Sequence, residues 1–298
     1  MQFHAPQAIT ALDAGVNVLS EVPAAVSIDE CRAIVEAWGR SNAGYMMAED
    51  YLFSRPNTTV SEIVGAGRFG VPYYAEGEYL HELKGFNEIT TWRRKWQTGV
   101  NGVTYGTHSL GPILRWFPGE RVIEASGAGS GHHYRDPRGD EYENEDSSIM
   151  LCRMSGSGLV KIRVDMLSDR PHAMTNYQLQ GSDGCYESAR ARGEANRIWL
   201  RGDGGSGKEL AWSDLEAYEA QHLSESWRRY GKIAAPSGHG GGDYIVMREF
   251  VDSLVEKRTP LIGIHEAMDM TLPGLVSQRS VLEQSTWLPV PDSRDWID

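Results

Sequence analysis

The spacing of apolar residues changes near residue 70, and this change limits the possible folds more than any other feature of the sequence. Before it, helix-like and strand-like segments alternate, at residues 5–12, 16–22, 27–38, 45–48 and 58–66. The third segment begins with Ser27 and Glu30, which are spaced as a helix-capping box. Alternating helices and strands build a parallel sheet, so residues 1–70 are predicted to form an α/β unit.

Strand patterns separated by Gly, Asp or Ser dominate residues 71–298. The predicted strands are residues 71–83, 121–129, 147–155, 159–167, 175–182 and 197–201, and the predicted helices are residues 108–117, 243–257 and 265–284. This combination predicts an α+β domain, in which helices face an open and mostly antiparallel sheet. The boundary between the two domains is expected near residues 69–72.

The first unit is typical of the second half of a doubly wound dinucleotide-binding domain, a Rossmann fold. The first half of such a domain carries a strand, a Gly-rich turn and a helix, and nothing before Gly15 can supply them. We therefore expect a chain that starts partway through that domain or that has given up the dinucleotide. Residues 202–208 resemble a phosphate loop, but Glu209 replaces its metal-binding hydroxyl, and a hairpin turn explains the glycines.

The balance of charge restricts the class of ligand. The 298 residues include 29 Lys and Arg against 41 Asp and Glu, which gives a net charge of −12. This acidity argues against nucleic acid and anionic membranes as partners. No apolar run is long enough to cross a bilayer, and no signal peptide is visible. We expect a small polar ligand and a cytoplasmic location.

Disulfides and metal sites are not expected. Cys31, Cys152 and Cys185 are odd in number and widely spaced, so they are predicted to be reduced thiols in or near the core. The adjacent His132 and His133 are poorly placed to bind one ion, because neighbouring side chains diverge in both helices and strands.

One cluster of polar residues that could carry chemistry lies in the strand pattern at residues 74–81. In a strand, Tyr79 and His81 share one face, whereas Glu76 and Glu78 share the other. The alternative is a half-exposed edge strand whose polar residues face water.

Two histidines form the other candidates. His108 precedes an apolar helix, and a helix start should lower its pKa and keep it neutral, as a general base requires. A capping or core histidine is the alternative. His239 lies among four glycines in residues 236–243, which allow close backbone approach to a ligand and lead to a helix with Asp243 at its N-cap. A simple hinge is the alternative there.

Four motifs, in order, resemble the Gfo/Idh/MocA oxidoreductase family. They are Val-Leu-Ser-Glu-Val-Pro at residues 18–23, the strand that contains Tyr79, Thr-His-Ser-Leu-Gly-Pro at residues 107–112, and Gly-His-Gly-Gly-Gly-Asp at residues 238–243. The resemblance covers nearly the whole chain. It implies a Rossmann domain followed by an α+β domain, a carbohydrate between them, NAD or NADP as cofactor, and homo-oligomers formed through the C-terminal sheet.

Two positions depart from the usual dehydrogenases of that family. Val22 stands where they carry a lysine, and Thr104 stands where they carry an aspartate four residues before the catalytic histidine. The chain instead resembles the branch of NAD-dependent glycosidases typified by α-N-acetylgalactosaminidases, which also lack the lysine. That branch has segments similar to residues 48–50, 79–81, 105–108 and 238–241.

Carried over by position, the resemblance implies that Tyr79 and His108 are the catalytic base and acid. It implies two further groups of residues: Glu49, Arg94, Tyr105, Tyr177 and His239 at the sugar, and His4, Glu21 and Pro23 at the cofactor. In the implied reaction, NAD⁺ takes a hydride from C3 of the sugar, which acidifies the C2 proton and lets the C1 substituent leave. Water then adds, and the hydride returns. A mechanism with Glu76 and Glu78 as paired carboxylates is a weaker rival.

Two other functions remain open at this point. One is a cofactor-free carbohydrate-binding or scaffold subunit, and the other is an inactive fragment of a longer enzyme.

Overall fold

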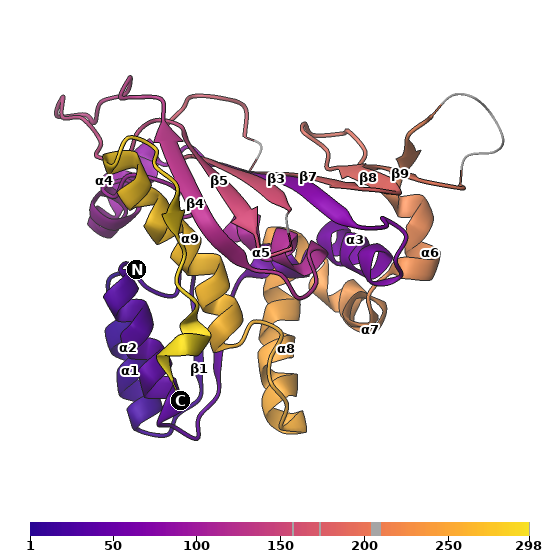
Figure 1. Ribbon diagram of the computed structural model, residues 1–298, viewed down its shortest axis with the longest axis horizontal. Coiled ribbons are helices and arrows are strands. Elements are labelled where there is room, and N and C mark those ends of the chain that lie inside the picture. The colour runs from indigo at the N-terminus through magenta and orange to yellow at the C-terminus, as the bar shows by residue number, and fades with distance from the viewer. Residues whose placement is uncertain (157, 173, 204–209, 298) are drawn as a thin grey trace.

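A computed structural model describes residues 1–156, 158–172, 174–203 and 210–297 (Figure 1). Residues 204–208 of the glycine-rich run lie outside the described residues, so the hairpin turn expected there stays a prediction. Within the described ranges, no helix is both long and apolar enough to span a membrane. The thiols of Cys31 and Cys152 are buried and Cys185 is half-buried, and all three are free, as expected.

The N-terminal unit is a small layer of two parallel strands and two helices. Its elements are α1 (His4–Asp13), β1 (Val18–Ser20), α2 (Ile28–Gly39) and β2 (Tyr45–Met47). The strands pair in parallel, with Val18 opposite Tyr45. Ser27 caps α2 by accepting a hydrogen bond of 3.2 Å from the N–H of Glu30, which confirms the predicted cap. The short helix η1 (Asp50–Phe53) and α3 (Arg55–Gly65) lead from this unit to the large sheet.

The large sheet has nine strands in the order β10-β9-β8-β7-β3-β6-β5-β4-β11. Their bounds are β3 (Pro72–Leu80), β4 (Val122–Gly129), β5 (Ser148–Met154), β6 (Leu159–Asp165), β7 (Met174–Gly181), β8 (Gly184–Glu187), β9 (Arg197–Leu200), β10 (Ser213–Asp214) and β11 (Leu288–Pro289). Every neighbouring pair is antiparallel except β3 and β6, which confirms a mostly antiparallel sheet. The strands that the sequence did not predict are β8, β10 and β11, which are too short to show alternation.

Helices gather on one face of this sheet, below it in Figure 1. The remaining helical elements are α4 (Lys84–Ile89), η2 (Arg93–Gln97), α5 (Thr107–Trp116), η3 (Leu215–Tyr218), α6 (Glu219–His222), α7 (Glu225–Ala234), η4 (His239–Gly241), α8 (Gly242–Glu256), α9 (Ile264–Leu282) and η5 (Ser293–Trp296). The three predicted helices correspond to α5, α8 and α9. The sequence predicted Asp243 at the N-cap of α8, and this prediction was wrong. Gly241 is the N-cap residue, and Asp243 lies in the first turn of the helix.

The C-terminal segment returns to the N-terminal unit. Helix α9 packs against both β4 and α2, and η5 packs against α2. The guanidinium of Arg32 lies 4.8 Å from the ring centre of Trp296, and the rings of Trp38 and His265 meet edge to face at 5.6 Å. The two ends of the described chain therefore share one layer (Figure 1).

Helix α5 packs directly on β3 at Gly77. A Cβ atom at this position would lie 2.8 Å from Cβ of Ser109 and 3.0 Å from Cδ1 of Ile113. The close approach fixes α5 beneath the middle of the sheet, and α5 carries His108 in its first turn.

Replacing Gly77 with Val should therefore push α5 away from β3. We expect Gly77→Val to lower the free energy of unfolding by about 1–3 kcal/mol, as overpacking does. Gly65→Ala is the control, because a Cβ there meets nothing within 4 Å; it should be neutral or stabilising by about 0.5–1 kcal/mol. Urea unfolding measures both. Equal midpoints for the two variants would contradict the packing described here.

Candidate active site

A cavity of about 410 Å³ lies at the carboxyl ends of β1, β2 and β3. The carboxyl ends of parallel strands are where open α/β sheets bind their ligands. The residues that line the cavity are Leu19, Glu21, Val22, Ala48, Asp50, Tyr79, His81, Leu83, Phe86, Trp92, Arg93, Gln97, Tyr105, His108, Met174, His239, Asp243, Val246 and Met247.

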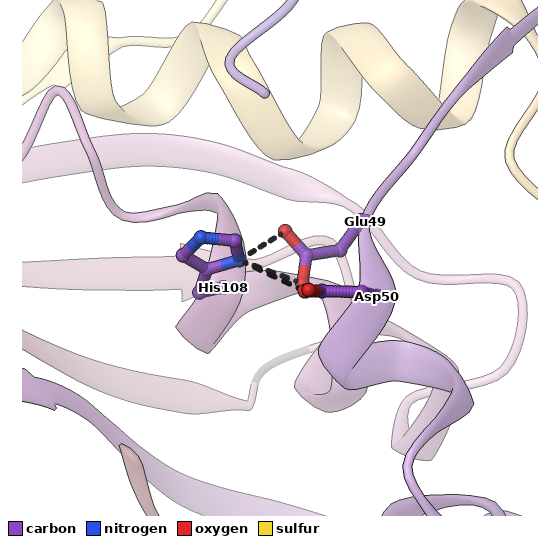
Figure 2. Close-up of side chains that lie close together, drawn as sticks. All are labelled: Glu49, Asp50 and His108. Atoms are coloured by element: carbon purple, nitrogen blue, oxygen red, sulfur yellow. Dashed lines mark hydrogen bonds and ion pairs between the residues drawn. The ribbon is translucent and has the colours of Figure 1, made fainter. Parts of the chain in front are cut away.

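His108 stands in the first turn of α5, as the sequence predicted, with its ring against two carboxylates (Figure 2). Its Nδ1 lies 3.0 Å from Oε1 of Glu49 and 3.5 Å from Oδ1 of Asp50. Glu49 is completely buried, and its Oε1 also accepts a hydrogen bond of 3.1 Å from the N–H of Tyr51. Figure 2 shows the second ring nitrogen of His108 on the side away from both carboxylates.

The predicted charge state of His108 was wrong. Burial alone would lower its pKa, but the charge and hydrogen bond of Glu49, together with the charge of Asp50, raise the pKa of His108 above its ordinary value. A helix start disfavours the imidazolium, but it is a weaker influence than a carboxylate 3.0 Å away. The two carboxylates therefore favour the protonated imidazole of His108 over the neutral base.

Asp50 is shared by two histidines. Its Oδ2 lies 2.7 Å from Nδ1 of His239, and that nitrogen is also 2.8 Å from Oδ1 of Asp243. Burial raises the pKa of Asp50, but the hydrogen bond from His239 and the charges of His108 and His239 outweigh it and hold that pKa below its usual range. The hydrogen bond to Asp50 is the main reason that the pKa of His239 rises to about 9.

The same atoms lie close enough together to hold a cation. Glu49, Asp50 and His108 form one such group, and Asp50, His239 and Asp243 form another. Three of these contacts, at 3.0, 2.7 and 2.8 Å, have equally the distances of charge-assisted hydrogen bonds between carboxylates and imidazoles. The expectation that the site holds no metal stays a prediction.

Tyr79 and His81 share one face of β3, as predicted, and are joined by a hydrogen bond of 2.9 Å between Oη and Nδ1. Burial lowers the pKa of His81 to about 4, and His172 nearby adds to the shift. Burial raises the pKa of Tyr79 well above its usual range. The phenol is therefore the donor and the neutral imidazole of His81 is the acceptor. The rings of Tyr105 and His108 lie 5.4 Å and 5.1 Å from that of Tyr79.

Three predicted sugar-binding residues lie outside the cavity lining: Glu49, which is completely buried behind His108, Tyr177 and Arg94. Tyr177 is buried behind the site, where its hydroxyl donates a hydrogen bond of 2.6 Å to the carbonyl of His108. Arg94 turns toward the acidic loop and donates to the carbonyl of Glu141 at 2.7 Å. The neighbouring Arg93 lines the cavity instead. Sequence spacing cannot tell which of two adjacent arginines faces inward, because residues 93–97 form a π-helical turn.

The predicted cofactor residues gather at the end of β1. Glu21 lines the main cavity, and His4 lines a neighbouring cavity of about 420 Å³ that also reaches Glu21. The Nδ1 of His4 lies 2.8 Å from the carbonyl of Pro23, so the imidazole N–H holds the turn after β1. Burial, followed by the charge of Asp50, raises the pKa of Glu21.

Glu76 and Glu78 lie on the opposite face of the sheet from the cavity. Glu76 pairs with Lys161, and Glu78 lies 3.6 Å from both Arg163 and Arg190. These carboxylates cannot flank a ligand in the cavity, which removes the paired-carboxylate mechanism.

The comparison with known families settles the relationship of the chain. Residues 53–297 match the family described as "Glycosyl hydrolase 109, C-terminal domain". The chain belongs to glycosyl hydrolase family 109. The predicted resemblance to glycosidases of the α-N-acetylgalactosaminidase type is thereby confirmed at the level of the family.

Relatives in family 109 are longer than this chain. A glycosyl hydrolase family 109 protein of Saccharopolyspora erythraea is 28% identical over 98% of this chain and 65% of its own length. An alpha-N-acetylgalactosaminidase of Shewanella oneidensis is 27% identical over 98% of this chain and 67% of its own length. The chain thus spans about two thirds of the length of these relatives.

Solved structures share the fold of this family 109 chain. Levoglucosan dehydrogenase in complex with NADH and L-sorbose matches with a TM-score of 0.78 and 18% identity, over 98% of this chain and 78% of that one. An NAD binding oxidoreductase from Klebsiella pneumoniae matches with a TM-score of 0.79 and 16% identity, over 97% of this chain and 78% of that one. These likenesses confirm the predicted architecture, a Rossmann-type layer joined to an open sheet domain.

The pKa of His239 gives a testable dependence of stability on pH. Because folding raises this pKa from 6.5 to about 9, protonated His239 stabilises the fold fully below about pH 6.5. That contribution is lost as the pH rises toward 9. We expect the free energy of unfolding of the wild type, relative to His239→Gln, to fall across this interval in urea titrations at successive pH values.

His265→Gln is the matched control for this experiment. Burial lowers the pKa of His265, so its titration cannot affect stability between pH 6.5 and 9. A constant difference between the wild type and His239→Gln across the interval would contradict the ion pair with Asp50.

Proposed function

We propose that this protein acts on carbohydrates with a nicotinamide cofactor, as the sugar-binding part of a redox glycosidase for N-acetyl-α-galactosaminides. The observation that carries the proposal is the position of His108. It is a buried imidazole backed by Glu49 and Asp50, next to Tyr79, in a cavity at the carboxyl ends of β1 and β2. The name of the Shewanella oneidensis relative supports the choice of sugar.

Tyr79 and His108 move the protons in this proposal. The imidazole of His108, whose pKa is raised by the two carboxylates, donates a proton to the departing C1 oxygen. Glu49 keeps the ring oriented. Tyr79 takes the C2 proton of the oxidised sugar on its oxygen as its own proton moves along the hydrogen bond to Nδ1 of His81. Both transfers reverse when C2 is protonated again, because the lowered pKa of His81 does not let it keep the proton. Tyr105 and His239 line the same cavity and contact sugar hydroxyls.

The cavity also suits the reactive end of NAD or NADP. Leu19, Glu21 and Val22 line it directly after β1, and His4 holds the following turn through Pro23. These residues would hold the nicotinamide, which supplies oxidation and later reduction of a sugar carbon when bound. Glu21 and Asp50 make their part of the cavity lining polar, so this part suits hydroxyl groups better than apolar groups.

We extend the proposal to domain organisation, assembly and location. Residues 1–70 and 71–298 form the two domains, homo-oligomers pair through the open face of the large sheet, and the protein acts in the cytoplasm. The second point is supported by the arrangement of the described elements, because the helices gather on one face of the large sheet and leave the other face available to a second copy (Figure 1).

The test follows solvent deuterium. The chain is incubated in D₂O with NAD⁺ and p-nitrophenyl N-acetyl-α-galactosaminide. We expect release of nitrophenol and a sugar product that carries deuterium at C2, because the C2 proton is removed and returned. Release without deuterium would contradict redox elimination, and absence of both signals would favour a subunit that only binds carbohydrate.

Tyr79→Phe and His108→Ala should each lower the rate of nitrophenol release by about 10²–10⁴-fold, the usual loss when an acid or base is removed. His133→Ala is the control, because His133 pairs with Asp146 at 2.7 Å outside the cavity lining. Unchanged rates in both site variants would remove these residues from the mechanism.

A further inference from the structure

The cavity lining contains side chains of two chemical kinds. Asp50, His108 and His239 are polar and charged, whereas a second group is apolar: Leu83, Phe86, Trp92, Met174, Val246 and Met247. We call this second group the apolar rim. Hydroxyl groups of a sugar suit the charged residues, and nothing in the reaction proposed above uses the rim.

The aromatic part of the rim is held in place before any ligand arrives. The guanidinium carbon of Arg93 lies 4.3 Å from the ring centre of Trp92 and 5.4 Å from that of Phe86. The ring of His81 meets Phe86 edge to face at 6.2 Å. A hydrogen bond of 2.6 Å from Arg93 to Oγ1 of Thr90 fixes the guanidinium. The two rings are thus positioned by stacking rather than by burial.

Two side chains of the rim are left open to solvent. Phe86 keeps 48% of its surface exposed, and Met247, which reaches the same cavity from α8, keeps 51%. Large apolar side chains gathered beside a polar cavity mark a surface that a ligand covers. A flexible thioether beside a flat ring suits ligands of variable shape with one apolar face.

We propose that the apolar rim is the subsite for the leaving group of the glycoside and that it selects leaving groups with a flat apolar face, such as an aryl group. The proposal rests on the proposed function, since it takes the sugar ring to lie against Asp50, His108 and His239. A sugar held there by its hydroxyls leaves its C1 substituent to the apolar side chains of the same lining. Stacking of that substituent on Phe86 and Trp92 buries the exposed apolar surface.

The test compares two ligands that differ in the leaving group alone. Dissociation constants of phenyl and methyl N-acetyl-α-galactosaminide are measured by calorimetry on the whole chain without nucleotide. We expect the phenyl glycoside to bind about 3- to 10-fold more tightly, the range that stacking of aromatic rings provides. Phe86→Ala and Trp92→Ala should each reduce this preference and leave the affinity for the methyl glycoside unchanged.

Trp212→Ala is the matched control, because Trp212 is an exposed tryptophan that stacks on Arg197, 5.6 Å away, outside the cavity lining. Phe86→Leu keeps an apolar side chain without the flat ring and should also reduce the preference. Unchanged binding of the methyl glycoside shows that each variant is folded. Equal affinity for both ligands in the wild type, or a preference that Phe86→Ala leaves undiminished, overturns the rim subsite while the sugar site stands. Binding of neither ligand overturns both proposals.

Discussion

The buried contact between Glu49 and His108 is the constraint on which the rest of the structure depends. An isolated carboxylate that is completely buried costs several kcal/mol, so Glu49 needs a positively charged or donating partner at short range. That partner, His108, lies on α5, and two glycines allow α5 to pack closely against its neighbours. Gly77 lets the helix approach β3, and a Cβ at Gly111 would lie 2.6 Å from Cγ of Glu49. The sheet domain and the N-terminal unit are thus joined at the cavity itself.

Asp50 extends this contact to the loop that precedes α8. A Cβ at Gly242 would lie 2.6 Å from the carbonyl oxygen of Asp50, so the loop of glycines packs on the backbone while His239 reaches the side chain. Carboxylates and imidazoles alternate from Glu49 to Asp243 across the floor of the cavity. An acidic chain can therefore present a site that is close to neutral where a sugar would lie.

Local patterns predicted the long elements and the position of His108, because both depend on neighbours within one turn or one strand. They could not predict the charge of His108, since its partners Glu49 and Asp50 lie 59 and 58 residues earlier in the chain. The same limit explains Arg94, which the acidic loop around Glu141 holds away from the cavity. Asp243 is a different case, because it pairs with His239 only four residues before it and lies in the first turn of α8. Long-range contacts decided the cases of His108 and Arg94.

The return of the last helix and η5 to α2 has a consequence for how the protein folds. The packing around α2 is not complete until Trp296 and His265 reach Arg32 and Trp38. Contacts between residues so far apart in sequence give a high contact order and slow the search for the native state. During synthesis, α2 emerges long before α9 and η5, so the face of α2 that these elements cover stays exposed, and accessible to chaperones, until they have been made.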